Sequence, residues 1–294
     1  MKRQTVGTSM ILVAAACFGT LAIFGKLAED VGLNTTTLLT YRFVFGTAFI
    51  WVGLLLWRRA RLLPKRERRV ALALGLLYAS FTAFFFWGLL FVSAGVASLV
   101  FYTYPIYVYV FAVTLLNESL SRYKLAALVL ALAGVGFIVS GDAAGVDALG
   151  VLLVGLAALG YAGYVVGNRA ALGSIDADLL AGTAMLATTV STLVGALLLG
   201  RLAVPAGADQ WGIVLGIAAI GTALPIFLYV SGLDRIPASH ASVLSTAEPV
   251  VTVSLGVVAL GESITPVLVM GGLLVLVGVV LVQLDVTRET ETPG

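Results

Sequence analysis

Two stretches of this chain carry the same residues at the same spacing, 144 positions apart. Each has an Ala-Ser pair, a proline seven residues after the serine, and a glutamate thirteen residues after the proline. The first copy consists of Ala97, Ser98, Pro105 and Glu118, and the second of Ala241, Ser242, Pro249 and Glu262. The match extends to the pairs Gly88 and Gly232, Leu89 and Leu233, Ala94 and Ala238, Ser119 and Ser263, and Gly134 and Gly278. One constant offset over this length indicates that a duplication built the chain.

The chain is too apolar to form a water-soluble domain. Hydrophobic residues make up 60% of it and charged residues 11%, with a mean hydropathy of +1.08, whereas a soluble domain has about 25% charged residues. A helix needs about 20 apolar residues to cross the hydrocarbon core of a bilayer, and ten segments meet that requirement. We expect an all-α membrane protein with spans at 7–27, 36–57, 70–91, 94–116, 122–140, 147–167, 179–199, 211–232, 238–260 and 266–284.

Each copy of the duplicated unit holds five of these spans. Because five is odd, the second copy enters the membrane from the opposite side, so the two copies lie upside down relative to each other. We therefore expect a first repeat at 7–140, a second at 147–284, and a disordered cytoplasmic tail at 285–294. Inverted repeats are a feature of membrane transporters, in which two halves open alternately around a site between them.

The positive charges predict the orientation of the chain. Cytoplasmic loops of membrane proteins carry an excess of Lys and Arg. If the N-terminus is cytoplasmic, 14 of the 17 Lys and Arg fall on the cytoplasmic side of the membrane. Lys26 and Arg201 fall on the outer side, and Arg42 lies within the second span. We expect a multi-pass protein of the plasma (inner) membrane with both termini in the cytoplasm. The basic loop 58–69 is expected to contact anionic headgroups rather than nucleic acid.

Several kinds of site are disfavoured by composition. With one Cys and one His, the chain lacks the residues for a Cys or His metal site, and we expect neither a metal nor a cofactor. It has no phosphate-binding glycine-rich motif, so the chain alone is not an ATP-driven pump. A membrane-embedded enzyme would be expected to show interfacial clusters of His, Asp or Glu. We therefore expect a protein that is not an enzyme.

Further motifs accompany the repeat. The second copy reads Ala-Glu-Pro-Val at 247–250 and Leu-Gly-Glu at 260–262, and the second span contains Tyr-Arg-Phe at 41–43. Together with the repeat, these motifs resemble the EamA-like family of the drug/metabolite transporter superfamily over residues 7–284. The first copy departs from the pattern, with Tyr104 in place of Glu248 and Asn117 in place of Gly261. The two halves are therefore not chemically equivalent.

The resemblance implies ten helices in two inverted five-helix repeats. Helices 1–4 and 6–9 would surround a central cavity, and helices 5 and 10 would lie at the periphery. It also implies export or exchange of small metabolites, without specifying which metabolite.

Glu248 is the first candidate for substrate binding or coupling. Ten residues at 1.5 Å per residue place it about 15 Å into the ninth span, near the middle of a core about 30 Å thick. A carboxylate there costs several kcal/mol unless it faces water, is paired or takes up a proton. Pro249 has no N–H, which leaves a carbonyl near Ser245 without its usual partner. The alternative is a protonated Glu248 that only hydrogen-bonds a neighbouring helix.

Arg42 allows three interpretations. It lies near the outer end of the second span, where its long side chain can reach the membrane surface. It can also form an anion site, or a fixed ion pair that stabilises the outward gate. Tyr102 and Tyr104 are further candidates for solute contact, because they lie beside Pro105 and carry hydroxyl groups that need partners.

The paired prolines and glutamates have expected mechanical roles. Pro105 and Pro249 are candidate helix breaks or gating points, since breaks at matching positions of two repeats indicate a binding region between them. Ordinary proline kinks inherited by duplication are the alternative. Glu118 and Glu262 lie at helix ends, and we expect them to hold the turn into the following helix.

The sequence thus predicts a secondary transporter that moves amino-acid-like, nucleobase-like or drug-like solutes across the plasma membrane. The expected mechanism is export by alternating access. Proton coupling, the transport direction, the substrate and a homodimeric state are left open. The expected partners are a small-molecule solute and the lipid bilayer, with no nucleic acid. The alternative is a sensor or assembly factor on a transporter scaffold that binds without moving solute.

Overall fold

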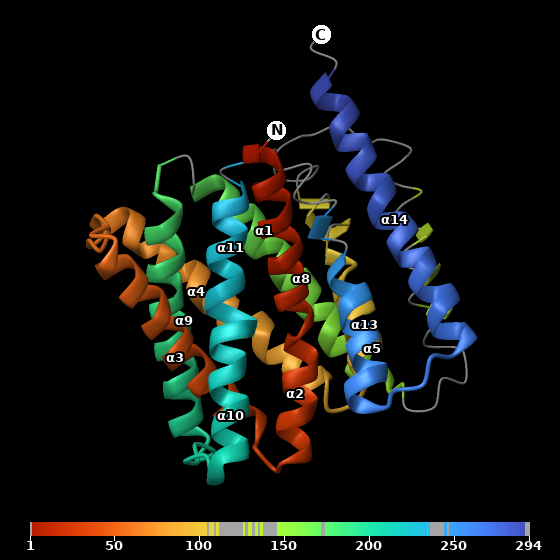
Figure 1. The fold of residues 1–294 in the computed structure, drawn as a ribbon, viewed down its shortest axis with the longest axis horizontal. Helices are drawn as coiled ribbons and strands as arrows, with labels where there is room; N and C mark the ends of the chain where they lie inside the picture. The colour runs from red at the N-terminus through yellow and green to blue at the C-terminus, as the bar shows by residue number, and fades with distance from the viewer. Residues whose placement is uncertain are drawn as a thin grey trace.

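The structure is a computed structural model in which every described regular element is a helix (Figure 1). It describes residues 2–291 except for Pro105, Tyr109, 112–125, 127–128, 131–132, 135, 138–145, 172–173, Asp234, 236–243 and Thr246. Two candidates from the sequence, Pro105 and Glu118, therefore lie outside the described residues, as does most of the fifth expected span.

The helices follow the apolar segments of the sequence. They are α1 (Lys2–Gly19), α2 (Leu21–Asp30), α3 (Thr35–Leu56), α4 (Lys65–Gly88), α5 (Ala94–Phe101), α8 (Ala148–Ala171), α9 (Ala177–Leu198), α10 (Gly207–Ala218), the π-helix η1 (Ala219–Ala223), α11 (Leu224–Leu233), α13 (Ala247–Leu260) and α14 (Pro266–Glu291). Within the described part, six helices are long and apolar enough to cross a membrane, and three shorter apolar helices accompany them. Each expected span other than the fifth overlaps at least one of the described helices, over part of its length in the fourth and ninth spans.

Helices of the two halves pack in matching pairs (Figure 1). In the first half, α4 lies against α8 and α9. A shift of 144 residues turns these contacts into those of α11 with α1 and of α10 with α3, and both are observed. The fourth span contacts α8 through α5, and the equivalent ninth span contacts α1 through α13. The packing therefore repeats with the sequence.

Contacts at the helix ends show that neighbouring helices run antiparallel. The backbone N–H of Asp147 donates to the carbonyl of Phe91, which puts the start of α8 beside the end of α4. Glu262, just after α13, contacts the first residues of α5, so α13 and α5 are antiparallel. These two helices belong to the equivalent fourth and ninth spans, and equivalent spans of an inverted repeat run in opposite directions.

Two ion pairs tie the loop after α3 to the start of α9. Arg59 Nη1 lies 2.6 Å from Asp178 Oδ2, and Arg61 pairs with Asp176. The two segments therefore lie at the same end of the bundle. Exposed pairs of this kind contribute little to stability, about 0–1 kcal/mol each.

The last helix, α14, stands at the edge of the bundle (Figure 1). Val269, Met270, Leu273 and Val277 on this helix are exposed in the absence of lipid, which fits the peripheral position expected for it. The helix continues to Glu291. Residues 285–291 are therefore helical, whereas the sequence predicts a disordered tail. No glycine or proline interrupts this stretch before Pro293, and an established helix extends at little cost.

Glycines let α4 approach its neighbours at backbone distance. A Cβ on Gly75 would overlap the carbonyl oxygen of Ala184 in α9 and lie 2.6 Å from Ala187 Cβ. The Thr188 hydroxyl donates to the Gly75 carbonyl at 2.9 Å across the same contact. Small residues and interhelical hydrogen bonds hold membrane helices together, because lipid supplies no hydrophobic driving force between them.

Glu262 joins the two halves at the end of the bundle where α5 begins. Its carboxylate oxygens accept hydrogen bonds from the backbone N–H groups of Ala94 at 2.6 Å and Gly95 at 3.1 Å. The sequence predicts that Glu262 holds the turn into the following helix, α14. In the structure its carboxylate instead caps α5 of the first half, satisfying two N–H groups that have no partner inside that helix.

Substituting Gly75 by alanine should destabilise the protein by about 1–3 kcal/mol, because the added methyl group overpacks the contact of α4 with α9. Thermal unfolding of the purified protein in detergent measures this effect. Gly155→Ala is the control, since a Cβ at Gly155 meets nothing within 4 Å. Equal melting temperatures for the two variants would contradict this packing.

Substituting Glu262 by glutamine should cost about 1–2 kcal/mol, because an amide has a single acceptor oxygen for the two N–H groups and loses the charge that favours a helix N-terminus. Thermal unfolding again reports the change. The control is Asp209→Asn, an exposed acid in the first turn of α10. A Glu262→Gln protein that melts at the wild-type temperature would show that the cap does not hold the halves together.

Candidate functional site

The first span is interrupted at Gly19 and Thr20, between α1 and α2. The Thr20 hydroxyl donates to the Cys17 carbonyl at 2.6 Å, and the Thr20 backbone N–H donates to the same oxygen at 3.1 Å. A threonine that bonds back to the preceding turn competes with regular helix hydrogen bonds and bends helices. The carbonyl of Gly19 is satisfied from outside the helix, by the Thr252 hydroxyl of α13 at 3.0 Å.

Glu248 lies against this interruption. A Cβ on Gly19 would sit 3.1 Å from the Glu248 carbonyl oxygen, a tighter distance than most Cβ contacts, so glycine here favours the close approach of α1 to the first turn of α13. Glu248 is half-buried. Among the described residues, no Lys or Arg forms an ion pair with it. The acid therefore occupies the contact between a broken helix of the first half and the start of a helix of the second.

Pro249 lies in the first turn of α13, which begins at Ala247. A proline is tolerated there, because the N–H groups of a first turn have no partner within the helix. Four residues before the proline, the Ser245 carbonyl accepts a hydrogen bond from the Tyr102 hydroxyl. Tyr102 follows directly after the last residue of α5. The carbonyl that the sequence leaves without a helical partner is thus satisfied by the opposite half.

Four tyrosines gather around Glu248. Tyr102, Tyr104, Tyr161 and Tyr229 all lie within electrostatic range of its carboxyl group. The rings of Tyr104 and Tyr161 meet edge to face at 4.6 Å between centroids, and those of Tyr102 and Tyr104 at 5.5 Å. We call this group of four rings and one carboxyl the tyrosine–glutamate cluster.

The cluster draws on both halves of the protein. Tyr102 and Tyr104 come from the fourth span, Tyr161 from α8, Tyr229 from α11 and Glu248 from α13. Tyr161 and Tyr229 were not among the residues selected from the sequence. The sequence could have indicated these two residues only because each is a tyrosine in an apolar helix, where its hydroxyl group needs a hydrogen-bond partner.

Arg42 lies in other surroundings and is almost completely buried, with 1% of its surface exposed. The interpretation that its side chain reaches the membrane surface is therefore wrong. Its Nε donates to the Thr222 hydroxyl in η1 at 2.9 Å, and its guanidinium carbon lies 4.9 Å from the Phe43 ring centre and 5.3 Å from that of Phe86. Tyr78 is also an electrostatic neighbour. The guanidinium packs in the interior because α3 and η1 meet there.

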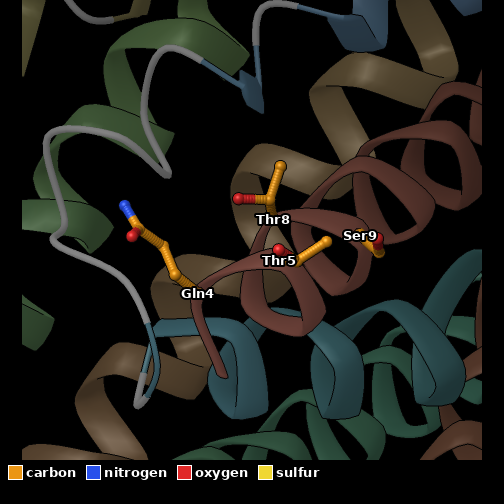
Figure 2. Close-up of a pocket in the computed structure, with 4 residues that line it drawn as sticks. All are labelled: Gln4, Thr5, Thr8 and Ser9. Carbon is orange, nitrogen blue, oxygen red and sulfur yellow. The ribbon is translucent and has the colours of Figure 1, made fainter. Parts of the chain in front are cut away.

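A separate hollow of about 310 Å³ lies at the first turns of α1. Figure 2 shows its lining residues Gln4, Thr5, Thr8 and Ser9, all on one helix. These side chains are uncharged, and none of them belongs to the tyrosine–glutamate cluster. The described residues contain no group of three His, Cys, Asp or Glu that could hold a metal ion. The cluster is therefore the best-supported candidate site.

Comparisons with known proteins agree with this architecture. Two proteins of Bacillus subtilis (strain 168), named as the uncharacterized transporters YcbK and YoaV, are each 26% identical to this chain. The alignments cover 92% of this chain and 90% of YcbK, and 95% of this chain and 99% of YoaV. A solved crystal structure that is 22% identical matches the fold with a TM-score of 0.69, over 98% of this chain and 99% of that one.

The family comparison finds the duplication directly. The profile of the EamA-like transporter family matches twice, over residues 5–140 and again over residues 148–284. These ranges agree closely with the two repeats at 7–140 and 147–284. The chain belongs to the EamA-like transporter family and is a multi-pass membrane transporter made of two copies of the family's unit.

Proposed function

We propose that this protein exports small solutes across the plasma membrane by alternating access, with both termini in the cytoplasm and with the tyrosine–glutamate cluster as the solute site. The observation that carries the proposal is the position of Glu248. It is an acid without a described cationic partner, at the point where the two inverted halves meet. Acidic groups inside membrane proteins mark the paths of substrates and protons.

The chemistry of the cluster suits a solute with a positively charged or amino group. A carboxyl group in the membrane is stabilised either by a proton or by a cation close to it. Solute and proton can therefore replace one another at Glu248, which would couple export to proton uptake. The surrounding tyrosines supply flat apolar faces for the rest of the solute and hydroxyl groups that hydrogen-bond it.

The broken helices give the site a means of opening. Transporter sites are usually formed where discontinuous helices meet at the interface between the repeats. The backbone groups that such helices leave free are satisfied by the opposite repeat. Here Tyr102 with Ser245 and Thr252 with Gly19 each link one half to the other. Rocking of one half against the other would break and remake a few such contacts while the longer helices stay intact.

Replacing Glu248 by glutamine should abolish export, because the amide can neither hold a proton nor pair with a cation. The measurement is an untargeted comparison of secreted and retained metabolites in cells that carry the wild type, Glu248→Gln or no transporter. Solutes that the wild type sends into the medium should fall at least roughly tenfold with Glu248→Gln, as expected for loss of about 1.4 kcal/mol or more of interaction.

The matched control for this experiment is Glu29→Gln. Glu29 is an exposed acid at the end of α2, and its one ion pair within the described part of the chain is with Lys26 at 3.4 Å. This variant should export like the wild type at equal protein levels. Full export by Glu248→Gln would refute the proposed role of Glu248. Tight solute binding by the wild type without any flux would instead favour the alternative of a sensor on a transporter scaffold.

Replacing Tyr102 by phenylalanine should lower stability by about 1 kcal/mol, because the Ser245 carbonyl loses its donor inside the membrane. Thermal unfolding in detergent and export in cells are the two measurements. Tyr41→Phe serves as the control, since the Tyr41 ring packs on Trp211 and its hydroxyl forms no hydrogen bond among the described residues. If Tyr102→Phe behaves like Tyr41→Phe in both measurements, the hydrogen bond between the halves has no role.

A further inference from the structure

Arg42 carries a buried positive charge for which the described residues provide no negative partner. Its side chain is 1% exposed, and none of the ion pairs in the described part includes it. Its Nη1 is the one buried side-chain nitrogen or oxygen among the described residues that lacks a hydrogen-bond partner. Buried polar groups without partners are rare, and each points to strain, to function or to a missing ligand.

The contacts that Arg42 makes leave one of its nitrogens unsatisfied. The two phenylalanine rings are cation–π partners of the guanidinium. Nε donates to the Thr222 hydroxyl, and the side chain also hydrogen-bonds with Tyr78. None of these contacts is an anion, and none reaches Nη1, although a charge removed from water needs both a counter-charge and complete hydrogen bonding. An anion at Nη1 would supply what is missing.

The surrounding structure holds the guanidinium in a fixed position. The Thr222 hydroxyl, in the π-helix η1, accepts from Nε and donates to the Ile217 carbonyl of α10 at 3.0 Å. Single π-turns are frequent at functional sites. A Cβ on Gly46 would lie 3.0 Å from Thr222 Cγ2, so this glycine allows α3 to approach η1. With Nε occupied, Nη1 is left to bind a ligand.

Arg42 also lies on the interface between the halves. Its neighbours Tyr78 and Thr222 are repeat-equivalent positions, since 222 − 78 = 144. A group bound at Arg42 would therefore contact matching helices of both repeats. This is the location expected for a solute site of an inverted-repeat transporter.

A continuous series of rings links Arg42 to the tyrosine–glutamate cluster. Tyr78 meets Tyr164 at 5.1 Å between ring centroids, Tyr164 meets Tyr161 at 6.2 Å, and Tyr161 meets Tyr104 at 4.6 Å. Tyr104 in turn neighbours Glu248. Tyrosine rings thus connect the buried Arg42 with the half-buried Glu248, and each ring carries an apolar face and a hydroxyl group.

We infer that Arg42 binds the carboxylate of the transported solute, so that the substrates are carboxylate-bearing molecules whose apolar body lies along the tyrosine rings. The assignment of a substrate class rests on the proposed transport function, whereas the anion site at Arg42 does not. A planar carboxylate matches the planar guanidinium better than other small anions do. Loss of Arg42 therefore removes binding of the anion without removing the rest of the site.

Acetate and acetamide are the probes that test the site, because they share their shape and differ in charge. Acetate should raise the melting temperature of the detergent-purified wild type by roughly 2 °C or more at saturating concentrations, and acetamide should leave it unchanged. In Arg42→Met the acetate increment should vanish. Methionine fills a similar volume, and replacing a buried charge by an apolar side chain is often neutral or stabilising, so this variant should fold.

Two further variants complete the test. Arg201→Met removes an exposed arginine and should keep the full acetate increment. If Arg42→Met does not fold, Arg42→Lys replaces it, and at least half of the increment should be lost because lysine lacks the planar fork. The inference is overturned if acetate fails to stabilise the wild type, or if the full increment survives substitution of Arg42.

Because the readout is binding, its result is independent of transport. If acetate stabilises the wild type through Arg42 but cells show no export, the anion site stands and the proposed transport function fails. If export depends on Glu248 but acetate has no effect, transport stands and the carboxylate assignment fails.

Discussion

Every backbone N–H and carbonyl inside a membrane must find a partner within the protein, and the centre of this structure is organised around that requirement. The first span breaks at Thr20, α5 ends at Phe101 and α13 begins at Ala247. Each interruption exposes carbonyl groups that would be costly in lipid. Side chains of the opposite half satisfy two of them, Thr252 for the Gly19 carbonyl and Tyr102 for the Ser245 carbonyl.

The two sides of the bundle differ in the length of their helices. On one side, threonine hydroxyls of α9 bond the backbone of the long helices α3 and α4, for example Thr189 to the Phe43 carbonyl at 2.9 Å and Thr188 to the Gly75 carbonyl at 2.9 Å. On the other side, α5 and α13 are short; Glu262 joins them at one end, and the hydrogen bond from Tyr102 to the Ser245 carbonyl joins them at the other. Short helices tied at their ends, beside a frame of long helices, suit a transporter in which the short helices move.

The sequence predicts the arrangement of the helices well, because it depends on long apolar segments and on the parity of a repeat. The positions of individual side chains depend on contacts between distant segments, which no local pattern contains. Glu262 illustrates this, since its place at the end of α13 follows from the sequence but its capping of α5 does not. The burial of Arg42 is a second example, because the meeting of α3 with η1 determines it. Tyr161 and Tyr229 join the cluster for the same reason.

The central claim is that the two halves rock against each other about the tyrosine–glutamate cluster. Distances between pairs of spin labels on the protein in liposomes test it most directly. The single native cysteine, Cys17, is replaced first. One label pair at Leu90 and Ile264 reports on the end where α5 begins, and a pair at Val6 and Ser174 reports on the opposite end. Each pair joins the two halves, and all four residues are exposed. The account predicts two populations of label–label distances at each end. When the solute or the pH changes their proportions, the wider distance should become more frequent at one end while the narrower distance becomes more frequent at the other. One unchanging distance at both ends under every solute and pH condition would contradict it.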